Sequence, residues 1–342
     1  QIGHVAKVLY SRRMPASVSD DSSGSARRAL SDHLERVHGK PLQVIDGLIK
    51  GTRRVVWPLE TEPLVSIIIP TRDRLSLTRT AVESILRETA YRAFEIIIVD
   101  NGSVEPETLE WFETIDNSAD NLRIIRDERP FNYSALNNGA IRQSKGDVIA
   151  LVNNDIEVRN GSWLSEMVSL AARPEVGCVG AKLYYPDGRI QHAGVRVGLD
   201  GVAGHPFLFF PATHPGYFGR LVMRQELSAV TAACLLLRRS VFDEVGGLNE
   251  TDLAVAFNDI DLCLKVGSAG YRNIWTPFAE LVHHESASRG RDNTPERKSR
   301  LHSEIKFMKT KWNTESFNDP AYNINVRLDE VHTTYAQPIW EV

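Results

Sequence analysis

The sequence has little cysteine and no long apolar run. Its three cysteines, Cys178, Cys234 and Cys263, lie far apart, and their spacing fits neither a disulfide framework nor a zinc site. We expect them to be the reduced, buried thiols of a cytosolic protein. No apolar stretch approaches the roughly 20 residues that a membrane-spanning helix needs. A disulfide-stabilised scaffold is therefore excluded, and the sequence offers no candidate transmembrane helix.

Neither sign of charge dominates the chain. It has 40 basic and 44 acidic residues among 342, so the formal net charge is −4. This balance argues against a nucleic-acid-binding surface, and we expect no nucleic-acid partner. The length suits one large domain with appendages, or two domains. Because the chain starts with Gln1 rather than Met, we expect it to be a piece of a longer protein.

Two phosphate-binding fingerprints are also absent. No G-x-G-x-x-G follows the first predicted strand, and no G-x-x-x-x-G-K-[ST] is present. The Rossmann dinucleotide and P-loop interpretations therefore lack their glycine-rich loops. A sugar nucleotidyltransferase would be expected to carry such a loop where this sequence has Pro70 to Arg74, which disfavours that class of enzyme.

From Val65 onward, apolar strands alternate with amphipathic helices. Strands are predicted at 65–69, 94–99, 122–125 and 148–152, and helices at 75–88, around 109–112 and at 134–143, the last with Ser134 as N-cap. The alternation predicts an α/β fold with a doubly wound, parallel sheet. Right-handed crossovers would bring the carboxyl ends of the four strands to one edge.

Composition suggests three segments. Residues 1–62 are expected to be an N-terminal linker and short helical segment, 63–315 the main domain, and 316–342 a C-terminal extension. The Ser- and Asp-rich residues 17–25 predict a flexible linker. The other elements expected outside the alternation are a helix at 26–38, an edge strand at 53–57, a helix at 163–172, a strand at 176–185, hairpins and loops at 186–227, a central strand at 230–237, a helix at 259–270, short strands at 271–275 and 280–284, and a basic amphipathic helix at 295–312.

Polar clusters follow three of the predicted parallel strands, at residues 71–74, 100–103 and 153–155. Each cluster alone is more typical of a turn. Three clusters at one edge of a sheet favour a binding cleft, because ligands of open α/β sheets bind at the carboxyl ends of the strands. Asp155 would lie at this edge. A carboxylate there suits Mg²⁺ or Mn²⁺ together with the phosphates of a substrate.

Two further motifs carry candidate chemistry. On a predicted helix, Asp259 shares a face with apolar residues, whereas Asp261 points about 200° away, beside Lys265. We therefore expect Asp261 and Lys265 to form either a solvated pair or a group that supports the site residues from behind. We expect Asp259 to point inward, although a carboxylate in a first helical turn is also a common cap. His283 and His284 end a short predicted strand and would face opposite sides. One of them could bind a metal or a phosphate while the other packs.

Taken in order, these motifs resemble the inverting family-2 glycosyltransferases with the GT-A fold. The resemblance covers roughly residues 63–290, and it looks closest to bacterial rhamnosyltransferase-like enzymes of O-antigen and other surface polysaccharides. It implies a Rossmann-like, mostly parallel central sheet with helices on both faces. The matching segments are Val65 to Arg74, Ile98 to Ser103, Asn153 to Asp155, Thr231 to Cys234, Gly246 to Asn249, Asn258 to Leu262 and His283 to Ser286.

The resemblance also implies a role for individual residues. Asp259 matches the general base, and Asn153 and Asp155 fill the ends of the metal motif, with His283 or His284 as a late ligand of Mg²⁺ or Mn²⁺. Thr231, Ala232 and Asn258 would border the donor and acceptor. The donor would be a UDP- or dTDP-sugar, and the acceptor a growing glycan, including a lipid-linked one. The residues implied in nucleotide binding are Pro70, Thr71, Asp73, Arg74, Asp100, Asn101 and Asn154.

Two departures from the family pattern support an alternative. Asn153 stands where the first Asp of the metal motif is expected, and Asn258 where a Glu often precedes the base. A degenerate domain that binds sugar or scaffolds a neighbour is the competing interpretation. Residues 4–10 resemble the end of a preceding glycosyltransferase-like domain, so we expect fusion to other glycosyltransferase or related domains. We expect a cytoplasmic location, at the inner face of the membrane if the basic helix at 295–312 contacts lipid; a solvated face explains that helix equally well.

Overall fold

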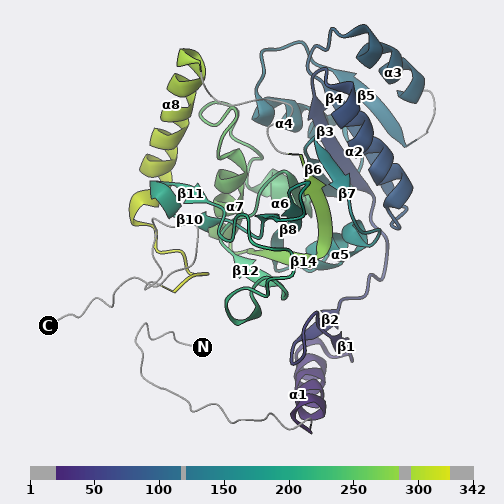
Figure 1. Ribbon diagram of the computed structural model, residues 1–342, viewed down its shortest axis with the longest axis vertical. Coiled ribbons are helices and arrows are strands. Elements are labelled where there is room, and N and C mark those ends of the chain that lie inside the picture. The colour runs from purple at the N-terminus through teal and green to yellow at the C-terminus, as the bar shows by residue number, and fades with distance from the viewer. Residues whose placement is uncertain (1–20, 117–120, 285–293, 324–342) are drawn as a thin grey trace, which may run out of the picture.

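The computed structural model describes residues 21–116, 121–284 and 294–323 (Figure 1). The residues 4–10 that resemble an upstream domain lie outside the described part. Helix α1 (Asp21–His38) packs beside a two-stranded antiparallel sheet of β1 (Gln43–Asp46) and β2 (Arg53–Val56). The helix already covers residues 21–25, so that part of the predicted linker is helical.

The N-terminal segment is attached to the main domain through a buried acid. Glu166 accepts hydrogen bonds from Arg54 of β2, at 2.7 Å, and from Arg224, at 2.8 Å. Burial acts to raise the pKa of Glu166, but the hydrogen bonds and charge of Arg224, with help from Thr276 and Arg54, outweigh it and lower the pKa. The guanidinium of Arg173 also stacks on Trp57, 3.8 Å from the ring centre.

The central sheet has the strand order β12-β14-β8-β13-β6-β3-β4-β5. Its parallel half consists of β3 (Val65–Thr71), β4 (Phe94–Asp100), β5 (Leu122–Arg126) and β6 (Val148–Val152), as predicted. Next to β6, β13 (Cys234–Arg238) runs antiparallel and pairs on its other side with β8 (Val176–Tyr184). All residues of β3, β4, β6 and β8 are buried, because helices cover both faces.

Two apolar cores lie on the two faces of this sheet. On one face pack α2 (Leu75–Glu88), α3 (Pro106–Asp116) and α5 (Trp163–Ala171). On the other pack α4 (Tyr133–Gln143), α6 (Arg239–Glu244), α7 (Asn258–Ser268) and part of α8 (Pro295–Trp312). The predicted mixed α/β architecture with helices on both faces is confirmed. The cysteines 178, 234 and 263 are buried free thiols, as expected.

The second half of the sheet differs from the prediction. A single strand, β14 (Arg272–His283), replaces the two short strands expected there, with its register against β8 interrupted between Trp275 and Glu280. Pro277 lies in that interruption, because proline cannot donate a ladder hydrogen bond. The smaller elements are β7 (Ile156–Val158), β9 (Ile190–His192), β10 (Arg196–Val197), η1 (Leu199–Gly201), β11 (Ala203–Gly204), η2 (Tyr217–Gly219), β12 (Gln225–Leu227) and η3 (Thr314–Ser316).

Ser134 is not the N-cap of α4. The cap is Asn132, whose side chain accepts a hydrogen bond from the backbone N–H of Ala135 at 2.9 Å. Ser134 lies inside the first turn and instead donates to the carbonyl oxygen of Leu253, at 2.6 Å. Within the described residues, no helix is long and apolar enough to span a membrane.

Candidate active site

A pocket of about 550 Å³ opens where the carboxyl ends of β3, β4 and β6 meet the start of α7. Eleven of the fifteen predicted site residues line it, and Asp73, Arg74, Asp100 and His284 do not. The predicted cleft therefore exists. The lining residues are Pro70, Thr71, Arg72, Asn101, Phe131, Tyr133, Asn153, Asn154, Asp155, Thr231, Ala232, Ala233, Val255, Phe257, Asn258, Asp259, His283 and Arg297.

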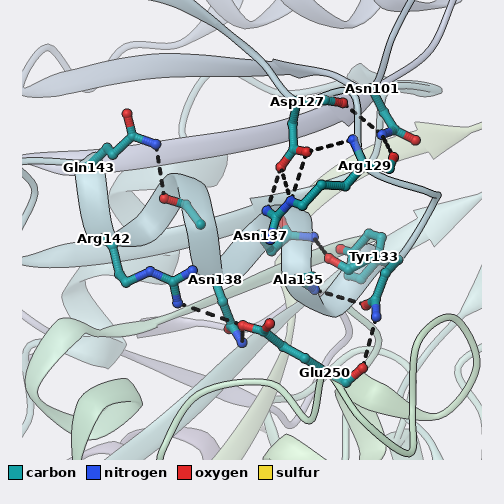
Figure 2. Close-up of polar contacts among 12 residues, drawn as sticks. Asn101, Asp127, Arg129, Tyr133, Ala135, Asn137, Asn138, Arg142, Gln143 and Glu250 are labelled. Atoms are coloured by element: carbon teal, nitrogen blue, oxygen red, sulfur yellow. Dashed lines mark hydrogen bonds and ion pairs between the residues drawn. The ribbon is translucent and has the colours of Figure 1, made fainter.

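The strand-end wall of the pocket, formed by Thr71, Asn101, Asn154 and Asp155, is held by hydrogen bonds within the wall and by others from α2 and the loop after β5. The amide of Asn154 donates to the hydroxyl of Thr71 at 2.8 Å, and that hydroxyl shares a 2.7 Å bond with Thr78. Figure 2 shows the amide of Asn101 reaching the carbonyl oxygens of residues 127 and 129. The buried Oδ1 of Asn101 has no hydrogen-bond partner within the described residues.

Three of the predicted nucleotide-binding residues are not among those that line the pocket. Asp73 accepts hydrogen bonds from the backbone N–H groups of Val104 and Glu105, at 2.8 and 2.9 Å. Asp100 is paired with Arg126 at 2.6 Å. The backbone N–H of Arg74 points to Glu105. These contacts brace the loops after β3 and β4, so Asp73, Arg74 and Asp100 support the wall rather than line the pocket.

Asp155, Asn153 and His283 form the candidate metal centre. Asp155 Oδ1 lies 3.1 Å from His283 Nε2, which is 3.3 Å from the amide of Asn153. His284 faces the other way and lies 3.3 Å from Glu157, as alternation along a strand requires. A carboxylate and an imidazole fit Mg²⁺ or Mn²⁺ when substrate phosphates complete the shell, and Asn153 would add an oxygen ligand once its amide turned so that Oδ1 rather than Nδ2 faced His283. No group of three His, Cys, Asp or Glu side chains that could hold a metal alone occurs in the described ranges.

Across the pocket, Asp259 lies in the first turn of α7. The side chain is partly exposed, and its two oxygens accept the backbone N–H groups of Ala232 at 3.0 Å and Ile260 at 2.9 Å. Phe257, just before the helix, has φ 59°, in the left-handed region that bulky residues rarely adopt. Such strain persists only when surrounding structure imposes it, and it is common at functional sites.

The solvated environment considered for Asp261 is wrong, although its pairing with Lys265 is present at 3.4 Å. A solvated pair was one of the two expectations, but this carboxylate is fully buried and accepts hydrogen bonds from Lys311 Nζ at 2.7 Å and Trp312 Nε1 at 2.8 Å. Both partners belong to α8. The periodicity of α7 alone cannot show that a helix 50 residues away in sequence covers its polar face.

Comparison with known proteins identifies the family. Residues 66–246 match the family model described as Glycosyl transferase family 2. The chain belongs to this family. It is 58% identical, over 99% of its length, to protein y4gI of Sinorhizobium fredii, and 42% identical, over 86%, to the O-antigen biosynthesis protein RfbC of Myxococcus xanthus. The chain spans 38% and 23% of the lengths of these two relatives.

The fold agrees with the family. A crystal structure of GalNAc-T7 with UDP, GalNAc and Mn²⁺ superposes with a TM-score of 0.57 at 15% identity, covering 89% of this chain and 65% of that one. The fold is therefore the GT-A fold, and this chain is a glycosyltransferase domain of family 2.

Sequence reasoning missed several pocket residues of this family-2 domain. Tyr133 is partly buried and lines the pocket together with both carboxylates: desolvation raises its pKa, and the charges of Asp259 and Asp155 add to the rise. Phe131 and Tyr133 flank Asn132, the N-cap of α4, and two aromatic residues beside a helix cap could have indicated a pocket-lining position. Phe257 and Arg297 gave no local signal, because tertiary packing brings them to the pocket.

Proposed function

We propose that this domain is an inverting enzyme that transfers a sugar from a UDP- or dTDP-sugar to a hydroxyl of a growing surface glycan of the O-antigen type, with rhamnose-like sugars as first candidates. The observation that carries the proposal is that Asp155 and Asp259, 104 residues apart in the numbering, line one pocket at the carboxyl ends of the parallel strands, where ligands of open α/β sheets bind. A sugar carbon between them would face a base on one side and its departing diphosphate on the other.

In this mechanism Asp259 is the general base. Its carboxylate takes the proton of the acceptor hydroxyl as that oxygen bonds to the anomeric carbon, while the bond from this carbon to the diphosphate oxygen breaks. Attack from the opposite face inverts the configuration. The N–H groups of Ala232 and Ile260 orient the carboxylate. A positioned base contributes typically about 10²–10⁴-fold to the rate.

The opposite wall would bind the nucleotide. We assign contacts with the uridine or thymidine to Pro70, Thr71, Asn101 and Asn154, because the free Oδ1 of Asn101 can accept the N–H of such a base. Thr231, Ala232 and Asn258 border the donor sugar and acceptor in this assignment.

The metal proposal follows from the same wall. Asp155, Asn153 and His283 would hold Mg²⁺ or Mn²⁺, and His284, which faces Glu157, would not. Bound there, the cation would offset the negative charge that develops on the leaving diphosphate.

Location and partners are proposed from the same chemistry. A lipid-linked acceptor would bring the domain to the cytoplasmic face of a membrane, where the exposed lysines of α8 could meet anionic lipid. The greater length of the relatives supports a domain that works beside others.

A donor screen tests the proposal. We expect UDP or dTDP to bind in calorimetry with Mn²⁺ present, and one of their sugar derivatives to be hydrolysed slowly to the nucleoside diphosphate. If neither nucleotide binds, the domain is a scaffold or a sugar-binding module. Release of pyrophosphate would instead indicate a nucleotidyltransferase.

A further inference from the structure

Helix α8 carries a buried acid that is not part of the pocket. The side chain of Glu304 is 2% exposed, and its Oε1 accepts the backbone N–H groups of Val255 at 2.8 Å and Ala256 at 3.2 Å. Its other oxygen lies 3.5 Å from Arg300 on the same helix. A carboxylate that accepts two consecutive backbone N–H groups fixes the orientation of both peptide planes, because charge-assisted hydrogen bonds are short and directional.

The turn that Glu304 holds leads directly to the proposed base. Val255 and Phe257 line the pocket, and the left-handed conformation of Phe257 sets the direction in which α7 starts. The carbonyl oxygen of Phe257 then accepts the backbone N–H of Asp261 inside the helix. A shift at residues 255–256 would therefore reach Asp259 through only three peptide units.

Helix α4 holds the other side of the same loop. The backbone N–H of Tyr133 donates to the carbonyl oxygen of Ala254 at 2.7 Å, and the hydroxyl of Ser134 donates to that of Leu253. Figure 2 shows Glu250, earlier in the loop, beside Asn138, whose amide donates to it at 2.8 Å. The loop is thus clamped between α4 and α8, which lies next to α7 in Figure 1.

We propose that Glu304 is a positioning residue for the reaction: by locking the peptides of Val255 and Ala256 it maintains the strained backbone at Phe257 that directs Asp259 into the pocket. The inference rests on the proposed role of Asp259 as base. It predicts that a substitution of Glu304 changes turnover without changing nucleotide affinity. Loss of Glu304 should misplace the base while the nucleotide contacts, which come from β3, β4 and β6, stay intact.

The test compares Glu304→Met, which removes the acceptor, with Glu304→Gln, which keeps an oxygen at the same distance. Release of nucleoside diphosphate is measured with the sugar nucleotide found in the donor screen, and UDP affinity by calorimetry with Mn²⁺. We expect Glu304→Met to lower kcat about 10- to 100-fold, the scale of a small misplacement, with UDP affinity within about 2-fold. Glu304→Gln should retain most of the activity. His302→Ala, on the exposed face of α8, is the control and should match the parent.

A purely structural role is distinguished by combining Glu304→Met with Asp259→Asn. If Glu304 acts through the base, the double variant turns over no more slowly than Asp259→Asn alone. The inference would be overturned if the loss of kcat in the double variant equalled the product of the two single losses. It would also be overturned if Glu304→Met lost UDP affinity by the same factor as kcat. If Glu304→Met does not fold, Glu304→Asp replaces it, and parent-level kcat in that variant would overturn the inference too. An active Asp259→Asn variant would instead refute the proposed function itself.

Discussion

The two walls of the pocket are built in different ways. The strand-end wall takes Thr71, Asn101, Asn154 and Asp155 from the ends of neighbouring strands, and its hydrogen bonds run within it and to the adjoining α2 and the loop after β5. The wall that carries Asp259, called here the base wall, is the start of α7, and its position depends on contacts from α4 and α8, which are far away in sequence. The strand-end wall is therefore braced by the parallel half of the sheet with its adjoining helix and loop, whereas the position of the proposed base also requires α4 and α8 to pack against the loop before α7.

This difference predicts that binding and turnover can be separated by substitution. Changes in the strand-end wall should affect nucleotide and metal affinity first. Changes in the base wall, or in the helices behind it, should affect turnover first. The predictions below run from the largest expected effect to the smallest.

Removing the base should have the largest effect. Asp259→Asn keeps the shape of the side chain but cannot take a proton, so we expect turnover to fall by about 10²–10⁴-fold while UDP affinity is retained. Steady-state turnover and calorimetry measure the two quantities. Asp252→Asn, an exposed acid in the preceding loop, is the matched control. Parent-level turnover in Asp259→Asn would remove the distinction between the walls.

The two adjacent histidines should behave differently. His283 faces Asp155, whereas His284 faces Glu157. We expect His283→Ala to weaken Mn²⁺-dependent UDP binding by at least about 10-fold, since even outer-shell partners of a metal act on this scale. His284→Ala should bind like the parent. Equal losses in both variants, in titrations of UDP with and without Mn²⁺, would show that the metal is not held at the strand-end wall.

The contact between α8 and Asp261 behind the base wall should contribute to the free energy of unfolding. Lys311→Met removes the closest cation from the buried Asp261. We expect the free energy of unfolding to fall by up to about 3 kcal/mol. Lys265, at 3.4 Å, remains to limit the loss. Turnover should fall while UDP affinity holds. Chemical denaturation gives the free energy, and Lys309→Met, which breaks the more exposed pair with Glu315, should cost less than about 1 kcal/mol. Equal losses in both variants would argue that the buried contact has no special role.

The smallest effect concerns the strand-end wall. Thr78→Val removes the hydroxyl that shares a hydrogen bond with Thr71 and preserves the shape of the side chain. We expect a loss of about 1 kcal/mol in stability and a few-fold loss in UDP affinity, with kcat for the bound donor unchanged. A drop in kcat without a drop in affinity would contradict the separation of the walls.

The strand-end wall could be predicted from the sequence more completely than the base wall. The parallel strands and α2 were found because their apolar periodicity is local, and the polar clusters after β3, β4 and β6 indicated the cleft. The environment of individual polar residues could not be predicted, because it depends on elements that are distant in sequence. Asp261 is covered by α8. Asp73 accepts a hydrogen bond from the backbone of Val104, and Asp100 forms an ion pair with Arg126. The single strand β14 also escaped prediction, because Pro277 resembles a break when its partner strand is unknown.

The most direct test of the account is an anomalous difference map from crystals of this chain soaked with UDP and Mn²⁺. We predict a manganese peak bonded to Asp155 and His283, with the nucleoside against Thr71 and Asn101 and the diphosphate facing Asp259 across the pocket. A manganese ion bound elsewhere, or UDP outside the pocket that holds both carboxylates, would contradict it.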